Sequence, residues 1–166
     1  MSPKGLEDAL YDVFASYPGA EASALKMAAA YYDYAAPATF GILNKAIVTP
    51  IRAAPLAAML GAVVLVPAVA TPVMFASAWG MGVAAFWPGI LVVGPLSGVV
   101  TECPSAAKLI PTLMTLMMSN PPTIRSLARD MSLLIHTVSI STLSLLTTPP
   151  PVPATMTFTW CLSKKP

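Results

Sequence analysis

The sequence predicts an all-α membrane protein: a transmembrane helical hairpin with flanking amphipathic helices and an extended C-terminal tail. Only 10% of the residues are charged and 56% are hydrophobic, whereas about a quarter of an ordinary soluble domain is charged. Residues 53–101 contain no charged side chain. Because about 20 apolar residues suffice to cross a bilayer, this apolar block is long enough for two crossings.

The chain of 166 residues has the length of one domain, and its composition divides it into four regions. Residues 1–52 are expected to form amphipathic helices outside the membrane or at its surface, and residues 53–101 the transmembrane hairpin. Residues 102–148 are expected to form interfacial helices. Residues 149–166 are expected to be a Pro-rich linker and an extended tail.

The N-terminal region is predicted to begin with a short amphipathic helix over residues 3–15. Ser2 is its expected N-cap, and Pro3 occupies the first helical position, where proline is favoured. An alanine-rich helix is expected over residues 21–36. A further amphipathic piece, over residues 39–52, carries basic side chains towards the apolar block.

The apolar block cannot be one straight helix, because at 1.5 Å per residue it would extend roughly 73 Å against a hydrocarbon core of about 30 Å. Two spans, at about 55–76 and 83–100, fit better and are joined by a turn in "SAWGMG". Trp79 and Trp87 flank this turn, and indole rings favour the membrane–water interface. They are the predicted interfacial anchors, together with Arg52 at the start of the block.

Small residues recur at a spacing of four along both predicted spans. Such spacing lets helix backbones approach closely in lipid, although alanine and glycine are also simply abundant here. Pro67 and Pro72 are expected to kink the first span, and a kinked helix needs neighbours to satisfy its freed carbonyls. The block therefore favours a packed assembly, with helix packing predicted at Ala57, Gly61, Gly94 and Gly98.

The C-terminal third is predicted to contain a helix over about 123–146. Its uncharged part, 131–148, is expected to be interfacial, with a short third membrane span as the alternative. "TTPPPVP" then has the composition of an extended linker. In "ATMTFTW" apolar residues alternate with threonines, which is the period of a strand, and a lone strand must find a partner elsewhere.

Most chemistry is absent from the sequence. His136 is the only histidine, so two histidines cannot hold a haem within the chain, and a zinc site would lack its usual ligands. Cys103 and Cys161 are far apart and have no metal-binding spacing. No phosphate-binding loop or nucleophile elbow occurs. We expect no enzyme, no catalytic, cofactor-binding or metal residue, no small-molecule substrate and, with a net charge of only +2, no nucleic acid.

The predicted function is that of a non-catalytic accessory subunit of a large multisubunit membrane complex. Its expected partners are other integral membrane subunits and lipids, with bound lipid in place of a cofactor. A respiratory or ATP synthase complex of the mitochondrial inner membrane is the leading expectation, because such complexes hold many small subunits. A thylakoid photosystem subunit, with pigment as neighbour, is one alternative. A monotopic hairpin that shapes membranes or coats lipid droplets is the other.

Overall fold

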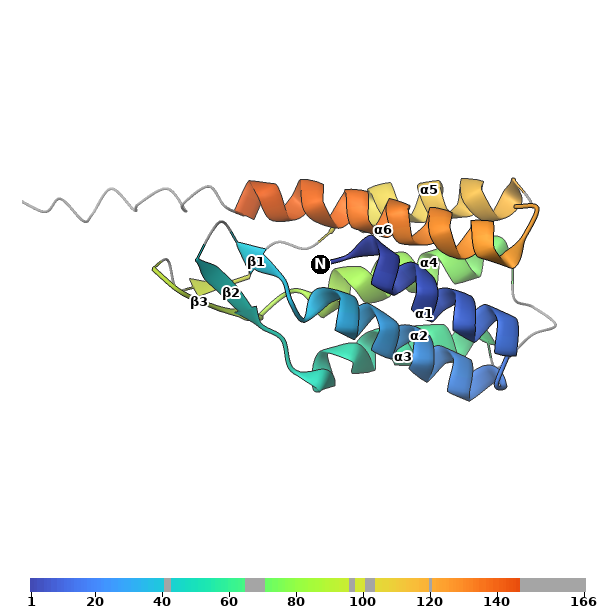
Figure 1. The fold of residues 1–166 in the computed structure, drawn as a ribbon, viewed down its shortest axis with the longest axis horizontal. Coiled ribbons are helices and arrows are strands. Elements are labelled where there is room, and N and C mark those ends of the chain that lie inside the picture. Colours follow the sequence, from blue (N-terminus) through green and yellow to red (C-terminus); the bar gives the residue numbers. More distant parts are fainter. Residues whose placement is uncertain (41–42, 65–70, 96–97, 101–103, 120, 147–166) are drawn as a thin grey trace, which may run out of the picture.

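The computed structural model of the chain describes residues 1–40, 43–64, 71–95, 98–100, 104–119 and 121–146. Helices dominate the described residues, and a small sheet lies at one end (Figure 1). The helices are α1 (Pro3–Ser16), α2 (Ala20–Ala35), α3 (Ala54–Val64), α4 (Pro72–Phe86), α5 (Ala106–Met118) and α6 (Ile124–Leu146). A short 3-10 helix, η1 (Pro50–Ala53), precedes α3.

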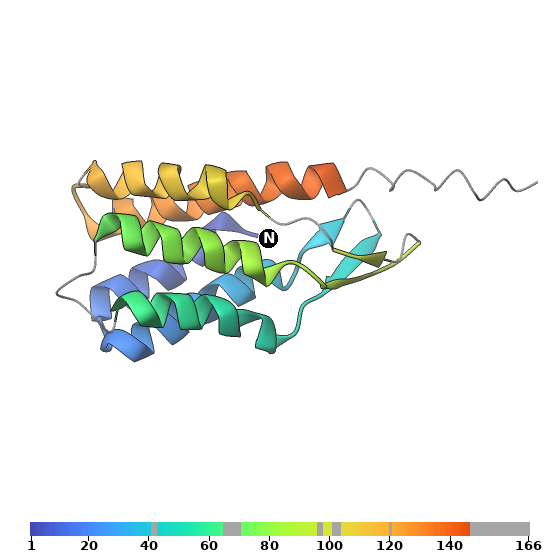
Figure 2. The same ribbon diagram turned by 180° about the vertical axis from the view of Figure 1, so that it is seen from behind.

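The helices form a closed ring in which each one packs against the next along the chain. The packed pairs are α1 with α2, α2 with α3, α3 with α4, α4 with α5, and α5 with α6. Helix α6 then returns to pack against α1, which closes the ring. The helices run roughly along the long axis of the molecule, and both the front and the back views show the sheet beyond their ends (Figures 1 and 2).

The first two helices agree with the predicted ones. Pro3 lies at the start of α1, and Ser2 is its N-cap residue, although the Ser2 side chain makes no capping hydrogen bond. Helix α1 ends at Tyr17, whose backbone is left-handed and whose N–H donates to Val13 O. Gly19 follows with φ +100°, a conformation that glycine adopts without a steric penalty. This tight turn reverses the chain direction, so that α2 packs against α1.

The predicted transmembrane hairpin is wrong. The first predicted span corresponds to α3, of 11 residues, and to the start of α4, of 15 residues, whereas about 20 are needed to cross a bilayer. The second predicted span holds the end of α4 and then strands rather than a helix. None of the helices in the described part of the chain, α6 included, combines the length and apolar character needed to cross a membrane.

Proline explains the start of α4. Thr71 is the N-cap, and its Oγ1 accepts a hydrogen bond from Met74 N at 3.2 Å. Pro72 follows in the first turn, where its missing N–H costs nothing. Pro72 therefore begins a helix and does not kink one, contrary to the prediction. Pro67, predicted as the other kink, lies outside the described residues.

The sheet has four antiparallel strands in the order β1-β2-β3-β4. They are β1 (Thr39–Phe40), β2 (Asn44–Ile47), β3 (Leu91–Val93) and β4 (Gly98–Val99). The amphipathic piece predicted over 39–52 forms β1, β2 and η1, so the sheet joins two segments that are far apart in sequence. Lys45 pairs with Val93 and Ile47 pairs with Leu91.

Aromatic side chains fill the interior at the sheet end of the ring. Tyr31 of α2, Phe86 of α4 and Trp87 just after α4 are fully buried. The Tyr31 and Phe86 rings meet edge to face, with centroids 5.0 Å apart. The sheet is attached to this cluster through Phe40, whose ring centroid lies 6.5 Å from that of Trp87. Core and sheet are therefore packed as one unit.

Candidate functional site

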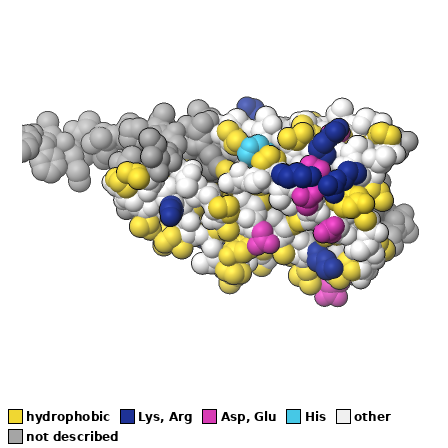
Figure 3. All heavy atoms as spheres, in the orientation of Figure 1, with side chains coloured by type: hydrophobic (Ala, Val, Ile, Leu, Met, Phe, Trp, Pro, Cys, Tyr) yellow, Lys and Arg dark blue, Asp and Glu magenta, His cyan; other side chains and the backbone are white. Residues whose placement is uncertain are grey.

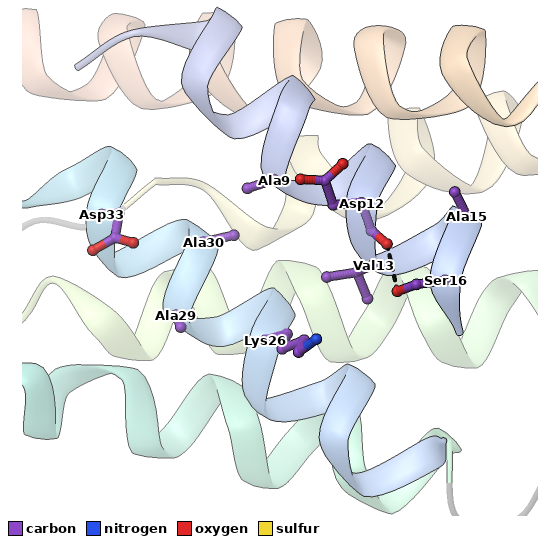
Figure 4. Close-up of a pocket in the computed structure, with 9 residues that line it drawn as sticks. All are labelled: Ala9, Asp12, Val13, Ala15, Ser16, Lys26, Ala29, Ala30 and Asp33. Atoms are coloured by element: carbon purple, nitrogen blue, oxygen red, sulfur yellow. Dashed lines mark hydrogen bonds between the residues drawn. The ribbon is translucent and has the colours of Figure 1, made fainter. Parts of the chain in front are cut away.

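An open groove with a volume of about 600 Å³ lies between α1 and α2 (Figure 4). Small side chains line its floor: Ala9 is half-buried and Ala30 is buried, while Ala29 is exposed. We call this the α1–α2 groove. It is lined by Ala9, Asp12, Val13, Ala15, Ser16, Lys26, Ala29, Ala30 and Asp33.

Three charged side chains stand along the α1–α2 groove. Asp12 comes from α1, and Lys26 and Asp33 come from α2; all three are exposed. Within the described residues none of them forms an ion pair. Ser16 Oγ lies beside them and donates to Asp12 O at 2.6 Å. The groove thus combines an apolar floor with charges that are free to meet a binding partner.

A separate cluster of charges joins α1 to α6. Arg125 of α6 lies 3.3 Å from the Glu7 carboxylate and 3.0 Å from that of Asp8. Its guanidinium also lies over the Tyr11 ring, 4.6 Å from the centroid, and Lys4 pairs with both carboxylates. Figure 3 shows charged side chains grouped on this face of the molecule. Because these charges are already paired with one another, we assign them to the contact between α1 and α6 and not to a binding site.

A polar network crosses the aromatic core. Trp87 Nε1 donates to the Tyr31 hydroxyl at 2.8 Å, and this contact is buried. The Tyr34 hydroxyl and His136 Nδ1 are joined by a hydrogen bond of 2.9 Å. Ser139 Oγ is buried near both tyrosine hydroxyls, yet it has no hydrogen-bond partner of good geometry among the described residues. The two hydrogen-bonded pairs lie beside each other, with the Tyr31 and Tyr34 ring centroids 5.7 Å apart, between the half-exposed His136 and the fully buried Trp87.

Burial sets the proton affinities in this network. Burial raises the pKa of Tyr34 to about 12 and raises the pKa of Tyr31 further, although the hydrogen bond from Trp87 opposes the rise at Tyr31. Burial lowers the pKa of His136, and the positive charge of the N-terminal amino group lowers it as well. Both tyrosines therefore stay protonated near neutral pH, and His136 is mostly uncharged.

The two hydrogen bonds join helices: Tyr34 of α2 to His136 of α6, and Tyr31 of α2 to Trp87 at the end of α4. His136 forms no ion pair with a carboxylate anywhere in the described chain, and a catalytic histidine is usually oriented by such a group. The same part of the chain holds no group of three or more His, Cys, Asp or Glu side chains placed to bind a metal ion.

The predicted helix-packing residues are not brought together. Gly61 lies where α3 faces α2, since a Cβ placed on it would be 4.0 Å from Ala24 Cβ, and Ala57 is half-buried on the same helix. Gly94 follows β3 and Gly98 lies in β4. These two glycines therefore belong to the sheet and not to a helix.

The predicted interfacial anchors have contacts within the protein. Trp79 and Trp87 are both fully buried in the protein core. Arg52 donates hydrogen bonds to the carbonyl oxygens of Pro88 and Gly89, at 2.6 and 2.8 Å. Arg52 thereby ties the start of α3 to the chain that follows α4.

The residues of the α1–α2 groove were not predicted as a site. Carboxylates on a helix are ordinarily its solvated side, and alanine is common in helices because of its high helix propensity. Their spacing is nevertheless a signal: Lys26, Ala29 and Asp33 recur every three or four residues and so share one face of α2. The sequence could not show that this face would border a second helix.

Comparison with known proteins gives no relative for this chain. Neither a family model, nor a curated protein, nor a solved structure matches it.

Proposed function

We propose that the protein is a non-catalytic accessory subunit that binds a helix of a partner protein in the α1–α2 groove. The observation that carries the proposal is an open groove with an alanine floor and three unpaired charges. Amphipathic helices bind in such grooves, with apolar side chains inward and charges along the edges. The proposal keeps the predicted role of an accessory subunit and drops the transmembrane hairpin.

A helix suits the α1–α2 groove better than a small molecule does. Small-molecule sites are usually concave and surround most of the ligand, with a few polar groups that fix its orientation. This groove is open, and its floor is made of methyl groups such as those of Ala29 and Ala30. Small side chains allow two helix axes to approach closely, because the axial distance depends on the residues at the contact.

The charged side chains of the α1–α2 groove indicate which charges the partner helix should carry. Lys26 and Asp33 are seven residues apart on α2, which is two helical turns or about 10.5 Å. A partner helix that carries a carboxylate and a basic side chain at the same spacing would pair with both. Asp12 adds a second negative charge, so the partner helix should be basic on the side that faces α1.

The proposal is tested in native assemblies that contain the full chain. Cross-linking through the Lys26 amine, followed by mass spectrometry, should identify a helical peptide with this charge spacing. The Ala29→Trp variant fills the groove from an exposed position and should weaken binding of that peptide by about tenfold or more. Asp33→Lys should also weaken binding, and a partner peptide with the matching charge reversed should restore it.

The matched control is Ala58→Trp, an alanine on α3 that is also exposed but lies outside the α1–α2 groove. It should leave peptide binding unchanged. On a native gel the unaltered chain should migrate with a large assembly, and Ala29→Trp should release it. Migration of the unaltered chain as a free small species would contradict the proposal, as would equal binding by the two tryptophan variants.

The location of this assembly stays a prediction that rests on how many small subunits such complexes hold: the mitochondrial inner membrane, with the thylakoid membrane as the alternative. In either case the protein would be held there through its partner helix. The monotopic hairpin reading required the apolar block to form a membrane hairpin, and the described helices do not provide one. It is therefore not carried further.

A further inference from the structure

One face of the sheet is apolar and exposed. Side chains alternate between the two faces of a strand, and here Ala46 and Phe40 point towards the bundle and are buried. The opposite side, which we call the outer face, carries Thr39, Lys45, Ile47, Leu91, Val93 and Val99. Its four aliphatic side chains, Ile47, Leu91, Val93 and Val99, are 49%, 54%, 51% and 53% exposed.

The strand register gathers these side chains into one patch. Ile47 pairs with Leu91, and Leu91 pairs with Val99, so the three lie in a row across β2, β3 and β4. Val93 lies beside this row and pairs with Lys45. Hydrophobic side chains are among those visible at the sheet end in Figure 3, beside a basic side chain. Contiguous apolar patches of this kind usually mark a surface that something covers.

We propose that residues 155–160 of the same chain lie across the outer face and cover it. In "TMTFTW" the apolar Met156, Phe158 and Trp160 alternate with threonines. In an extended conformation these three side chains share one side of the segment. They would contact the outer face, and the threonines would face solvent.

The position and length of the chain agree with this occupant. Helix α6 ends at Leu146 at the sheet end of the molecule, where it packs near β1 (Figures 1 and 2). The linker over 147–153 is proline-rich, and its seven residues reach about 22 Å when extended. The six residues 155–160 span about 20 Å, whereas four paired strands are about 14 Å wide. The segment can therefore reach the sheet and cross all of it.

The test is photo-cross-linking in the full-length chain. Phe158→p-benzoylphenylalanine keeps an aromatic side chain at the central contact and should cross-link to residues of β2, β3 and β4. The same photoreactive residue at Thr159 should give little of this product, because it would point away from the sheet. Equal products from both positions, or none on the sheet, would overturn the proposal.

Two further measurements identify the occupant. Mixing isotope-labelled and unlabelled chains separates a cross-link within one chain, which supports the proposal, from one between two copies, which overturns it. Leu91→Asp on the outer face should lower the yield by about tenfold, because burying a leucine is worth at least 1.5 kcal/mol. Met118→Asp, at an exposed apolar residue of α5, should leave the yield unchanged; equal losses would count against the outer face.

The result is independent of the proposed partner helix. The outer face and the α1–α2 groove share no residues. A cross-link from position 158 to the sheet, with no effect of Ala29→Trp on assembly, would uphold the tail contact and reject the groove as a binding site. No cross-link from position 158 to the sheet, together with loss of assembly in Ala29→Trp, would reject the tail contact alone.

Discussion

The two buried indole N–H groups of the core, those of Trp87 and Trp79, differ in their hydrogen bonding. The Trp87 indole is fully buried, and its N–H has the Tyr31 hydroxyl as acceptor. Trp79 Nε1 is buried with no hydrogen-bond partner among the described residues, a situation that costs about 1–3 kcal/mol. Both indoles lie near Tyr31 of α2, since the Trp79 ring centroid is 6.3 Å from that of Tyr31, but only Trp87 donates to the Tyr31 hydroxyl.

Tyr31→Phe tests this hydrogen bond. The variant keeps the ring but removes the acceptor of the buried Trp87 N–H, so the free energy of unfolding should fall by about 1–3 kcal/mol. Tyr32→Phe, at the half-buried neighbour, should change it much less. Chemical denaturation of both variants provides the measurement, and equal stabilities would show that the hydrogen bond contributes nothing.

His136 should make stability depend on pH. Its pKa in the folded protein lies below the ordinary 6.5, chiefly because of burial. As pH falls through 6.5, the unfolded chain therefore binds a proton before the folded protein does. The contribution is fully present above pH 6.5 and is lost as pH falls towards the lower, folded pKa.

The prediction for His136 is checked by an NMR titration of its ring and by unfolding at several pH values. His136→Gln should remove the part of the pH dependence that lies just below pH 6.5. The altered proton affinity of Asp8, whose pKa is lowered by Lys4, acts only in more acidic solution. A folded-state pKa at or above 6.5 would contradict the buried contact with Tyr34.

At the scale of helices, glycines determine how closely α4 approaches its neighbours. A Cβ on Gly82 would meet the Leu56 side chain and would lie 3.0 Å from Leu56 Cα in α3. A Cβ on Gly80 would meet the Ile110 side chain in α5. Helix α4 thus packs between α3 and α5, while its apolar side chains Val73, Met74 and Met81 are exposed.

Gly82→Ala should destabilise the protein by about 1–3 kcal/mol, because the added methyl group overpacks the contact with α3. The higher helix propensity of alanine, worth up to about 1 kcal/mol, would offset part of this loss. Gly5→Ala in α1 is the control: a Cβ there meets nothing within 4 Å, so only the propensity gain remains. Thermal or chemical unfolding should move in opposite directions for the two variants.

The sequence predicts some helices well because their signals are local. The signals are Pro3 at the start of α1, Gly19 between α1 and α2, and the amphipathic pattern of α6, and each acts within a few residues. The strand at 91–93 was missed because a short apolar run is compatible with a helix or a strand. Gly94, Pro95 and Gly98 break that run, and together with its β-branched residues they were the available signal for a hairpin.

The error in fold class arises at the scale of the whole molecule. A helix that is hydrophobic all round is either buried among other helices or surrounded by lipid, and composition alone does not distinguish the two. Most of the buried surface of α4 faces α3 and α5, which precede and follow it in sequence, although Val73, Met74 and Met81 stay exposed. Closure of the ring depends on α1 and α6, which are separated by most of the chain. No local sequence pattern predicts the contact between α1 and α6.

The α1–α2 groove also depends on a contact between helices that the sequence pattern alone does not predict. The residue types along α2 could be read from the sequence, but the hollow exists only because α1 lies beside them at the distance set by their alanines. The pairing of β2 with β3 is likewise a long-range contact, so the outer face could not be predicted from either segment alone. Both proposed binding surfaces are products of the tertiary structure.

The most direct test of the closed ring is a nuclear Overhauser measurement between aromatic side chains in the full-length protein. The fold predicts contacts between the rings of Tyr31 and Phe86, whose centroids are 5.0 Å apart, and between those of Tyr34 and His136, at 5.9 Å. These contacts join α2 to α4 and α2 to α6. Their joint absence, with Trp79 and Trp87 in contact with lipid or detergent instead, would contradict the closed ring and restore the membrane hairpin.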